Sequence, residues 1–73
     1  MPKTIHTNEY IKIVGKLKQA RLDFGLTQKD AAVRIKKPQS YVSKVESGEQ
    51  RIDILELKSF AKIYNKKIYF FVK

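Results

Sequence analysis

The sequence predicts an all-α fold: a compact domain of four to five short helices, with a C-terminal segment that is either a short helix or a strand. Apolar residues recur at helical spacing through most of the chain, and capping residues and glycines divide this pattern into short segments. With 73 residues, the chain is expected to form a single domain, residues 1–73. It contains no cysteine, so no disulfide can supplement the packing of a small core.

The first expected helix carries apolar residues at positions 10, 13, 14, 17, 20 and 24, which lie on one helix face. Thr7 or Asn8 can cap its start, because a side-chain oxygen accepts from the free amides of the first turn. Gly25 can end it in the left-handed conformation. Arg21 falls on the apolar face, so its guanidinium must reach solvent or pair with a carboxylate.

Two short helices are expected next. Thr27 and Asp30 resemble a capping box and predict a helix over residues 28–35. The Lys-Lys-Pro sequence at 36–38 interrupts this helix, because a residue before proline avoids the α conformation. A third helix is therefore expected from about Pro38 to Glu46.

Asp53 and Glu56 form a second capping arrangement ahead of a fourth helix, and Asn65 is suited to a left-handed C-cap. The apolar face of that helix is expected to consist of Ile54, Leu57, Phe60, Ala61 and Tyr64. The remaining segment, 66–73, is rich in strand formers but is also short enough to be a last helical turn that packs Ile68 and Phe71 into the core.

The charge balance favours a nucleic-acid partner. Lys+Arg 16 against Asp+Glu 7 gives a formal net charge of +9, spread evenly along the chain, which a merely solubilising surface would also show. No apolar run approaches the roughly 20 residues of a membrane span, and Met1 to His6 has no signal-peptide core, so a cytoplasmic protein is expected. His6 is the single histidine, so neither a zinc site nor another cofactor is expected.

Two short helices joined by a turn of three to four residues, here about 27–46, are typical of a helix-turn-helix. The run LTQKDAAVRIKKPQSYVSKVESGEQRID, with its flanks from Leu17 to Tyr64, closely resembles the phage repressor and Cro-type (XRE) family. That resemblance implies a lambda-repressor-like domain and a sequence-specific transcriptional regulator, with a repressor the favoured form. Such a protein reads the major groove of a pseudo-palindromic double-stranded DNA site as a homodimer.

The resemblance also implies site residues. The third helix would lie in the major groove, and its exposed positions for base contacts are Gln39, Ser40, Ser43 and Lys44. Any surface helix shows a polar face, so this pattern gains weight only from the resemblance. The candidate phosphate contacts are Gln28, Lys36, Lys37, Tyr41 and Arg51, and for Tyr41 partial burial is an equal alternative.

Two further expectations come from the family pattern. Arg21 should form a buried or half-buried pair with Glu46 and hold the first helix against the third, a structural role. Lys36 occupies a turn position where the family usually has glycine in the left-handed conformation. Either this lysine costs about 1 kcal/mol of strain or the turn takes another shape before Pro38.

Three questions of function stay open in the sequence. Residues 66–73 are a candidate dimerisation segment, or they complete the core of a monomer. The alternative function is an antitoxin of a toxin–antitoxin pair. Such a protein would bind a toxin or another regulatory protein, and also its own promoter. Co-purification with a basic enzyme would favour this alternative. An enzyme is not expected, because paired carboxylates and a Cys–His constellation are missing.

Overall fold

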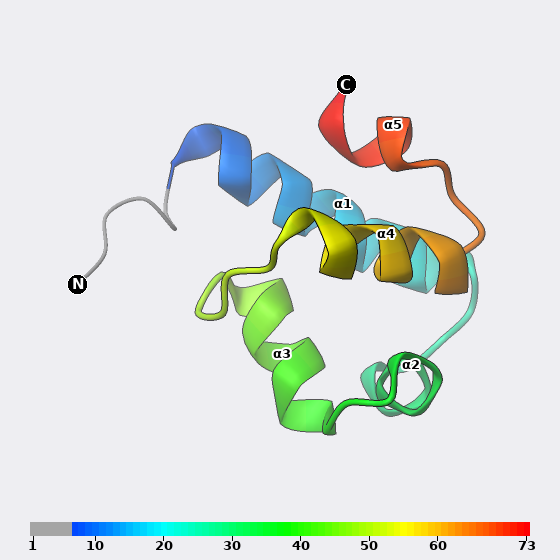
Figure 1. The fold of residues 1–73 in the computed structure, drawn as a ribbon. Helices are drawn as coiled ribbons and strands as arrows, with labels where there is room; N and C mark the ends of the chain where they lie inside the picture. Colours follow the sequence, from blue (N-terminus) through cyan, green and yellow to red (C-terminus); the bar gives the residue numbers. More distant parts are fainter. Residues whose placement is uncertain (1–6) are drawn as a thin grey trace.

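The computed structural model describes residues 7–73, which form five α-helices and no strand (Figure 1). The helices are α1 (Asn8–Asp23), α2 (Gln28–Ile35), α3 (Gln39–Ser47), α4 (Ile54–Ile63) and α5 (Ile68–Val72). The all-α prediction is confirmed, and the strand alternative for the C-terminal segment is wrong, because this segment forms α5. Residues 1–6, including His6, lie outside the described residues.

The ends of α1 are set by local side-chain chemistry. Thr7 caps its start by accepting a hydrogen bond from the Tyr10 amide at 3.2 Å, and Gly25 follows its end at φ 81°. The helix buries Val14, Leu17 and Ala20 as the apolar spacing predicts. Phe24 was expected on that face but is 43% exposed, because it lies one residue beyond the last helical turn.

The short helix α2 has the predicted bounds and a complete capping box. The Asp30 amide donates to Thr27 Oγ1 at 3.0 Å, and the Thr27 amide donates to Asp30 Oδ2 at 3.1 Å. Lys36 then adopts the left-handed conformation with φ 62° and ψ 44°. The turn therefore has the shape usual in the family, with a strained left-handed lysine at position 36, and not the alternative shape before Pro38. Helix α3 begins one residue after Pro38, whose extended ψ of 153° makes it the N-cap.

Helix α4 begins with the second predicted capping box, in which the Glu56 amide donates to Asp53 Oδ1 at 2.8 Å. Asn65 lies at φ 57° just after this helix, as its left-handed preference indicates. The apolar face is correctly predicted at four of its positions, Leu57, Phe60, Ala61 and Tyr64. Ile54 is the exception at 59% exposed, because the first residue of the helix lies at its solvent end.

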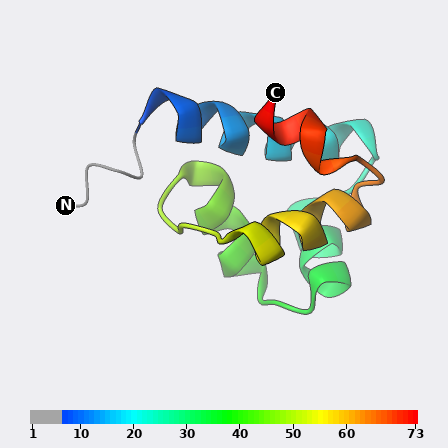
Figure 2. The same cartoon turned by 45° about the horizontal axis from the view of Figure 1, so that its top comes forward.

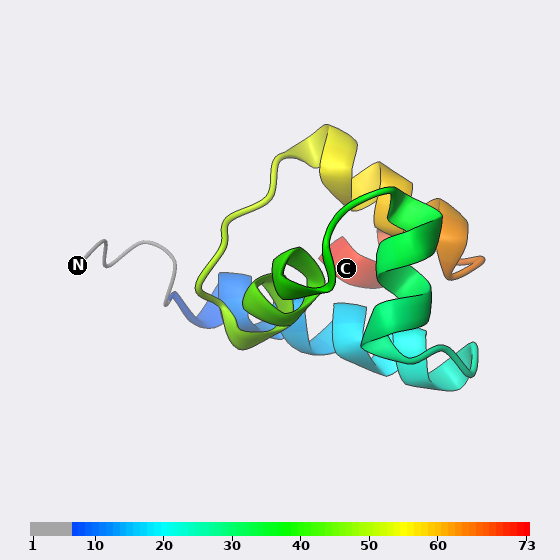
Figure 3. The ribbon, with the colours of Figure 1, turned by 90° about the horizontal axis from the view of Figure 1, so that it is seen from below.

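All five helices contribute buried residues to the core. Helix α2 runs between α1 and α4, and α3 is seen nearly along its axis when the domain is viewed from below (Figure 3). Helix α5 lies along α1 (Figure 2) and buries Phe71. The largest fully buried side chains are Tyr64, Phe60, Phe71, Leu17, Val42 and Val45. Within residues 7–73, no helix is long and apolar enough to cross a membrane.

Candidate nucleic-acid interface

Helix α3 has one buried face and one exposed polar face. Val42 and Val45 are fully buried against the other helices. The four positions expected to contact bases, Gln39, Ser40, Ser43 and Lys44, are all exposed. Residues separated by three or four positions share a helix face, so these side chains form one polar surface that leads away from the core.

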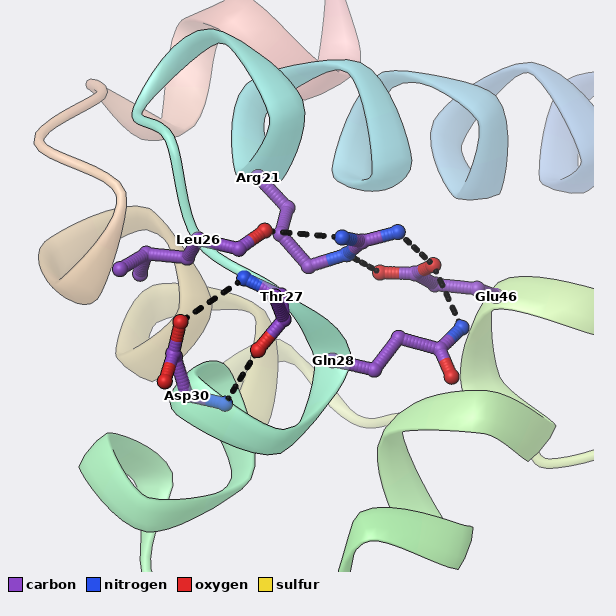
Figure 4. Close-up of polar contacts among 6 residues, drawn as sticks. All are labelled: Arg21, Leu26, Thr27, Gln28, Asp30 and Glu46. Carbon is purple, nitrogen blue, oxygen red and sulfur yellow. Dashed lines mark hydrogen bonds and ion pairs between the residues drawn. The ribbon is translucent and has the colours of Figure 1, made fainter.

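Arg21 and Glu46 form the ion pair that the resemblance implied (Figure 4). Nε of Arg21 donates to one carboxylate oxygen of Glu46 at 2.7 Å, and Nη2 donates to the other at 3.0 Å. Nη1 donates to the carbonyl of Leu26 at 2.8 Å, so the guanidinium also holds the α1–α2 turn. The two side chains are only 8% and 5% exposed. The hydrogen bond to Glu46 raises the pKa of Arg21, so the guanidinium stays charged.

Gln28 joins the same network, which the sequence reasoning missed. Its Nε2 donates to Oε1 of Glu46 at 3.1 Å, so one carboxylate accepts from two helices at once (Figure 4). Gln28 also lines an open groove together with Gln39, the first residue of α3. The structure therefore brings an expected phosphate contact and an expected base contact to the same groove.

Tyr41 takes the partly buried alternative. Its hydroxyl donates to Oε2 of Glu56 at 2.8 Å, and its ring stacks on Phe60 with centroids 6.2 Å apart. Burial, followed by this hydrogen bond, raises the pKa of Tyr41. This hydroxyl therefore links α3 to the cap of α4, and its contact with phosphate stays a prediction.

The loop between α3 and α4 carries Arg51 and is held by Tyr10 of α1. The Tyr10 hydroxyl donates to the carbonyl of Gln50 at 3.2 Å and accepts from the amide of Ile52 at 3.2 Å. The guanidinium of Arg51 lies 5.7 Å from the centroid of the Tyr10 ring. No sequence signal indicated this contact, because 40 residues separate Tyr10 from Gln50.

The two lysines of the α2–α3 turn have different surroundings. Nζ of Lys37 lies 5.2 Å from the centroid of the Tyr41 ring, next to α3. Lys36 instead lines a hollow that it shares with Phe24 and Lys62, behind the turn. Of the two, Lys37 is therefore the one that contacts a side chain of α3.

Most carboxylates of the described residues serve the fold. Asp30, Asp53 and Glu56 cap helices, and Glu46 belongs to the one salt bridge found within residues 7–73. The surface cations therefore have few acidic neighbours to neutralise them, which favours an anionic partner. Within the same residues, no group of three or more His, Cys, Asp or Glu could hold a metal ion.

Residues 17–71 match the sequence profile of a helix-turn-helix family of the XRE or Cro/C1 type. The chain belongs to this family. The matched range covers the turn, α3 and the ion pair, so this helix-turn-helix protein is a DNA-binding regulator of the XRE type. A comparison with curated protein sequences finds no match.

Proposed function

We propose that this helix-turn-helix protein is a transcriptional repressor that reads a specific DNA sequence with α3. The observation that carries the proposal is the exposed face of Gln39, Ser40, Ser43 and Lys44 on a helix whose far end is clamped by Glu46. Gln39 can pair with the N6 and N7 groups of adenine, the serines can donate or accept, and Lys44 can reach guanine or a phosphate. Occupancy of a promoter by such a domain blocks access to it.

Phosphate contacts would position α3 in the groove. We assign them to Gln28 at the start of α2, to Lys37 beside α3, and to Arg51 in the loop held by Tyr10. The N-terminus of α2 adds free amides and the positive end of a helix dipole next to Gln28. Lys36 is not included, because its side chain lines the hollow behind the turn.

We further propose that the protein binds as a homodimer on a pseudo-palindromic site in the cytoplasm, where the DNA lies. Half-sites one helical turn apart place two copies about 34 Å from centre to centre. The domain measures 30 × 26 × 20 Å, so its longest dimension is slightly shorter than that spacing, and a contact between two copies needs side chains at their facing ends. Phe71 of α5 completes the core, and the exposed Tyr69 and Val72, at 67% and 53%, are the side chains that we propose for the dimer contact.

The test of sequence reading is selection of bound duplexes from a random pool, followed by titration of selected and random duplexes across a salt series. A repressor gives a preferred site and a logarithmic salt slope of about −0.9 for each phosphate contacted. A polycation gives the slope without a preferred site. Equal affinity for selected and random duplexes at every salt concentration would contradict the proposal.

The dimer proposal needs a surface substitution, because removing residues 66–73 would also remove the buried Phe71. Tyr69→Lys should convert the complex on a two-half-site duplex from two protein copies to one, as measured by sedimentation. Val33→Lys is the matched control, because Val33 is 72% exposed and lies on α2. Two copies bound by the Tyr69 variant would place the dimer contact elsewhere.

A further inference from the structure

A basic hollow lies on the side of the domain where three helices end. It is formed by the C-terminal ends of α1, α2 and α4, and the residues that matter for its chemistry are Phe24, Arg34, Ile35, Lys36, Lys62 and Ile63. Gln28 and Gln39, which line the groove of the proposed DNA interface, line no part of it. The hollow therefore has no role in the function proposed above.

The charged side chains that line the basic hollow are all cationic. Arg34, Lys36 and Lys62 all line it, and no Asp or Glu does. The guanidinium of Arg34 lies 5.7 Å from the centroid of the Phe24 ring. Two acidic residues lie near the lining of the basic hollow. Asp30, one turn earlier on α2, is held in the capping box with Thr27, and the Thr27 hydrogen bonds and Arg34 lower its pKa. Asp23 directly precedes Phe24, and its carboxylate accepts a hydrogen bond from Gln19 at 2.7 Å. Three positive charges thus face one solvent-filled space.

These cations are not needed to satisfy the ends of the helices. A carbonyl near each C-terminus already accepts a backbone hydrogen bond. The Leu26 amide donates to the Arg21 carbonyl at the end of α1, the Lys37 amide to Ala32 at the end of α2, and the Lys66 amide to Ala61 at the end of α4. The bond lengths are 3.1, 3.0 and 2.8 Å. The side chains of Arg34 and Lys62 add a favourable charge to the helix dipoles, but their polar groups remain available to a ligand.

Apolar side chains also line the basic hollow. Phe24 is 43% exposed, and Ile35 and Ile63 are half-buried. A free phosphate or a DNA backbone would pair with the cations and leave this apolar surface exposed to water. A ligand that carries carboxylates around an aromatic or aliphatic side chain satisfies both parts, since burial of apolar surface and charge pairing then act together.

Backbone conformation at the hollow is also unusual. Within residues 7–73, the two non-glycine residues with positive φ are Lys36 at 62° and Asn65 at 57°, and both line this hollow. Glycine would relieve the strain at position 36, but it would also remove one of the three cations. A strained residue that supplies a charge is consistent with a binding surface.

We propose that the basic hollow is a docking site for an acidic segment of a partner protein, with one aromatic or aliphatic side chain seated on Phe24 between Arg34 and Lys62. Charge complementarity and the exposed ring identify this occupant. Because α2 separates the hollow from the groove of Gln28 and Gln39, a partner can bind while α3 contacts DNA.

The test uses a fluorescein-labelled peptide of ten residues that contains eight Asp or Glu around a central Phe-Leu pair, at about 0.15 M salt. Binding is measured by fluorescence anisotropy, and the site is mapped by amide chemical shifts of the full chain. Phe24→Ala and Lys62→Gln should each weaken binding about two- to fivefold, the range for one partly exposed contact. Lys58→Gln is the matched control, because Lys58 is exposed on the same helix, carries the same charge and does not line the hollow.

The expected map has its largest shifts at Phe24, Arg34 and Lys62, and a peptide with Gln in place of every acidic residue should not produce them. Circular dichroism of each variant confirms folding, and Lys62→Gln alone decides the matter if Phe24→Ala is unfolded. Equal weakening by Lys58→Gln, shifts confined to the exposed face of α3, or no shift at millimolar peptide would each overturn the proposal.

Discussion

The ring of Tyr10 and the guanidinium of Arg51 lie 5.7 Å apart, and the hydroxyl of that ring is hydrogen-bonded on both sides of Arg51, to Gln50 and to Ile52. Tyr10 therefore holds the backbone of the loop that presents the arginine. This contact spans the long separation between α1 and the α3–α4 loop. Under the proposed phosphate contact of Arg51, Tyr10 supports DNA binding by holding this loop.

Tyr10→Phe should lower affinity for selected and random duplexes by the same factor. The ring beneath Arg51 remains, but the loop loses two hydrogen bonds, each with a net contribution of about 0.5–1.5 kcal/mol. Titration of both duplexes measures the effect, which we expect to be about two- to tenfold. Ser59→Ala is the control, because it also removes a hydroxyl hydrogen bond, to the Leu55 carbonyl, but lies on α4, away from the loop. A loss confined to the selected duplex would mean that Tyr10 affects base reading instead.

Arg21→Ala should destabilise the fold by about 3–5 kcal/mol, because it leaves the buried carboxylate of Glu46 without its counter-charge. Urea denaturation followed by circular dichroism gives the free energy of unfolding. Arg34→Ala is the control and should have little effect, since Arg34 is exposed. Near-wild-type stability of the Arg21 variant would show that the pair contributes little.

Lys36→Gly should raise the free energy of unfolding by about 1 kcal/mol, because glycine adopts the left-handed conformation at φ 62° without a Cβ clash. Lys37→Gly removes the same charge one residue later, where φ is not positive, and should be neutral or destabilising. Thermal melting of both variants compares them. If both glycines have the same effect, the backbone strain at Lys36 is not the cause.

Tyr64→Phe should stabilise the protein by about 1–3 kcal/mol, because the buried Tyr64 hydroxyl has no hydrogen-bond partner among the described residues. The substitution should also change the response to alkali. Burial raises the pKa of Tyr64 above its ordinary value of 10.0, so the unfolded chain loses this proton first and stability falls as pH rises beyond about 10.

Urea denaturation at pH 7 and at several values between pH 9 and 11 measures both effects. The Tyr64→Phe variant should show a shallower loss of stability above pH 10, and the loss that remains includes the share of Tyr41, whose pKa burial also raises. A destabilised variant at pH 7 would indicate that the hydroxyl does have a hydrogen-bond partner, such as a bound water.

Gln39→Ala should weaken the selected duplex by about 1–3 kcal/mol and leave random duplexes nearly unaffected, because a base-reading side chain adds only to specific binding. Lys37→Gln is the comparison and should weaken both duplexes and reduce the salt slope by about one phosphate. Equal losses on both duplexes for Gln39→Ala would remove it from the base-reading set.

Local chemistry explains how much of the fold was predictable. Each capping box involves residues three positions apart, so Thr27 with Asp30 and Asp53 with Glu56 could be recognised without tertiary information. The pairing of Arg21 with Glu46 was accessible only through the family resemblance, because nothing local joins residues 25 positions apart. The contacts of Tyr10 and Gln28 gave no signal of either kind.

The amino-acid sequence by itself determined the approximate ends of the first four helices, most of their apolar faces and the size of the positive charge. The helix ends and apolar faces depend on neighbours within about one helical turn, and the charge depends on composition alone. Only the tertiary structure decided which partners the polar side chains have and which conformation the C-terminal segment adopts. Glu46 accepts from both Arg21 and Gln28, Tyr41 donates to Glu56, and α5 is a helix because burying Phe71 against α1 outweighs the strand preference of its residues. Burial and hydrogen-bond partners depend on which helices meet, and only packing specifies that.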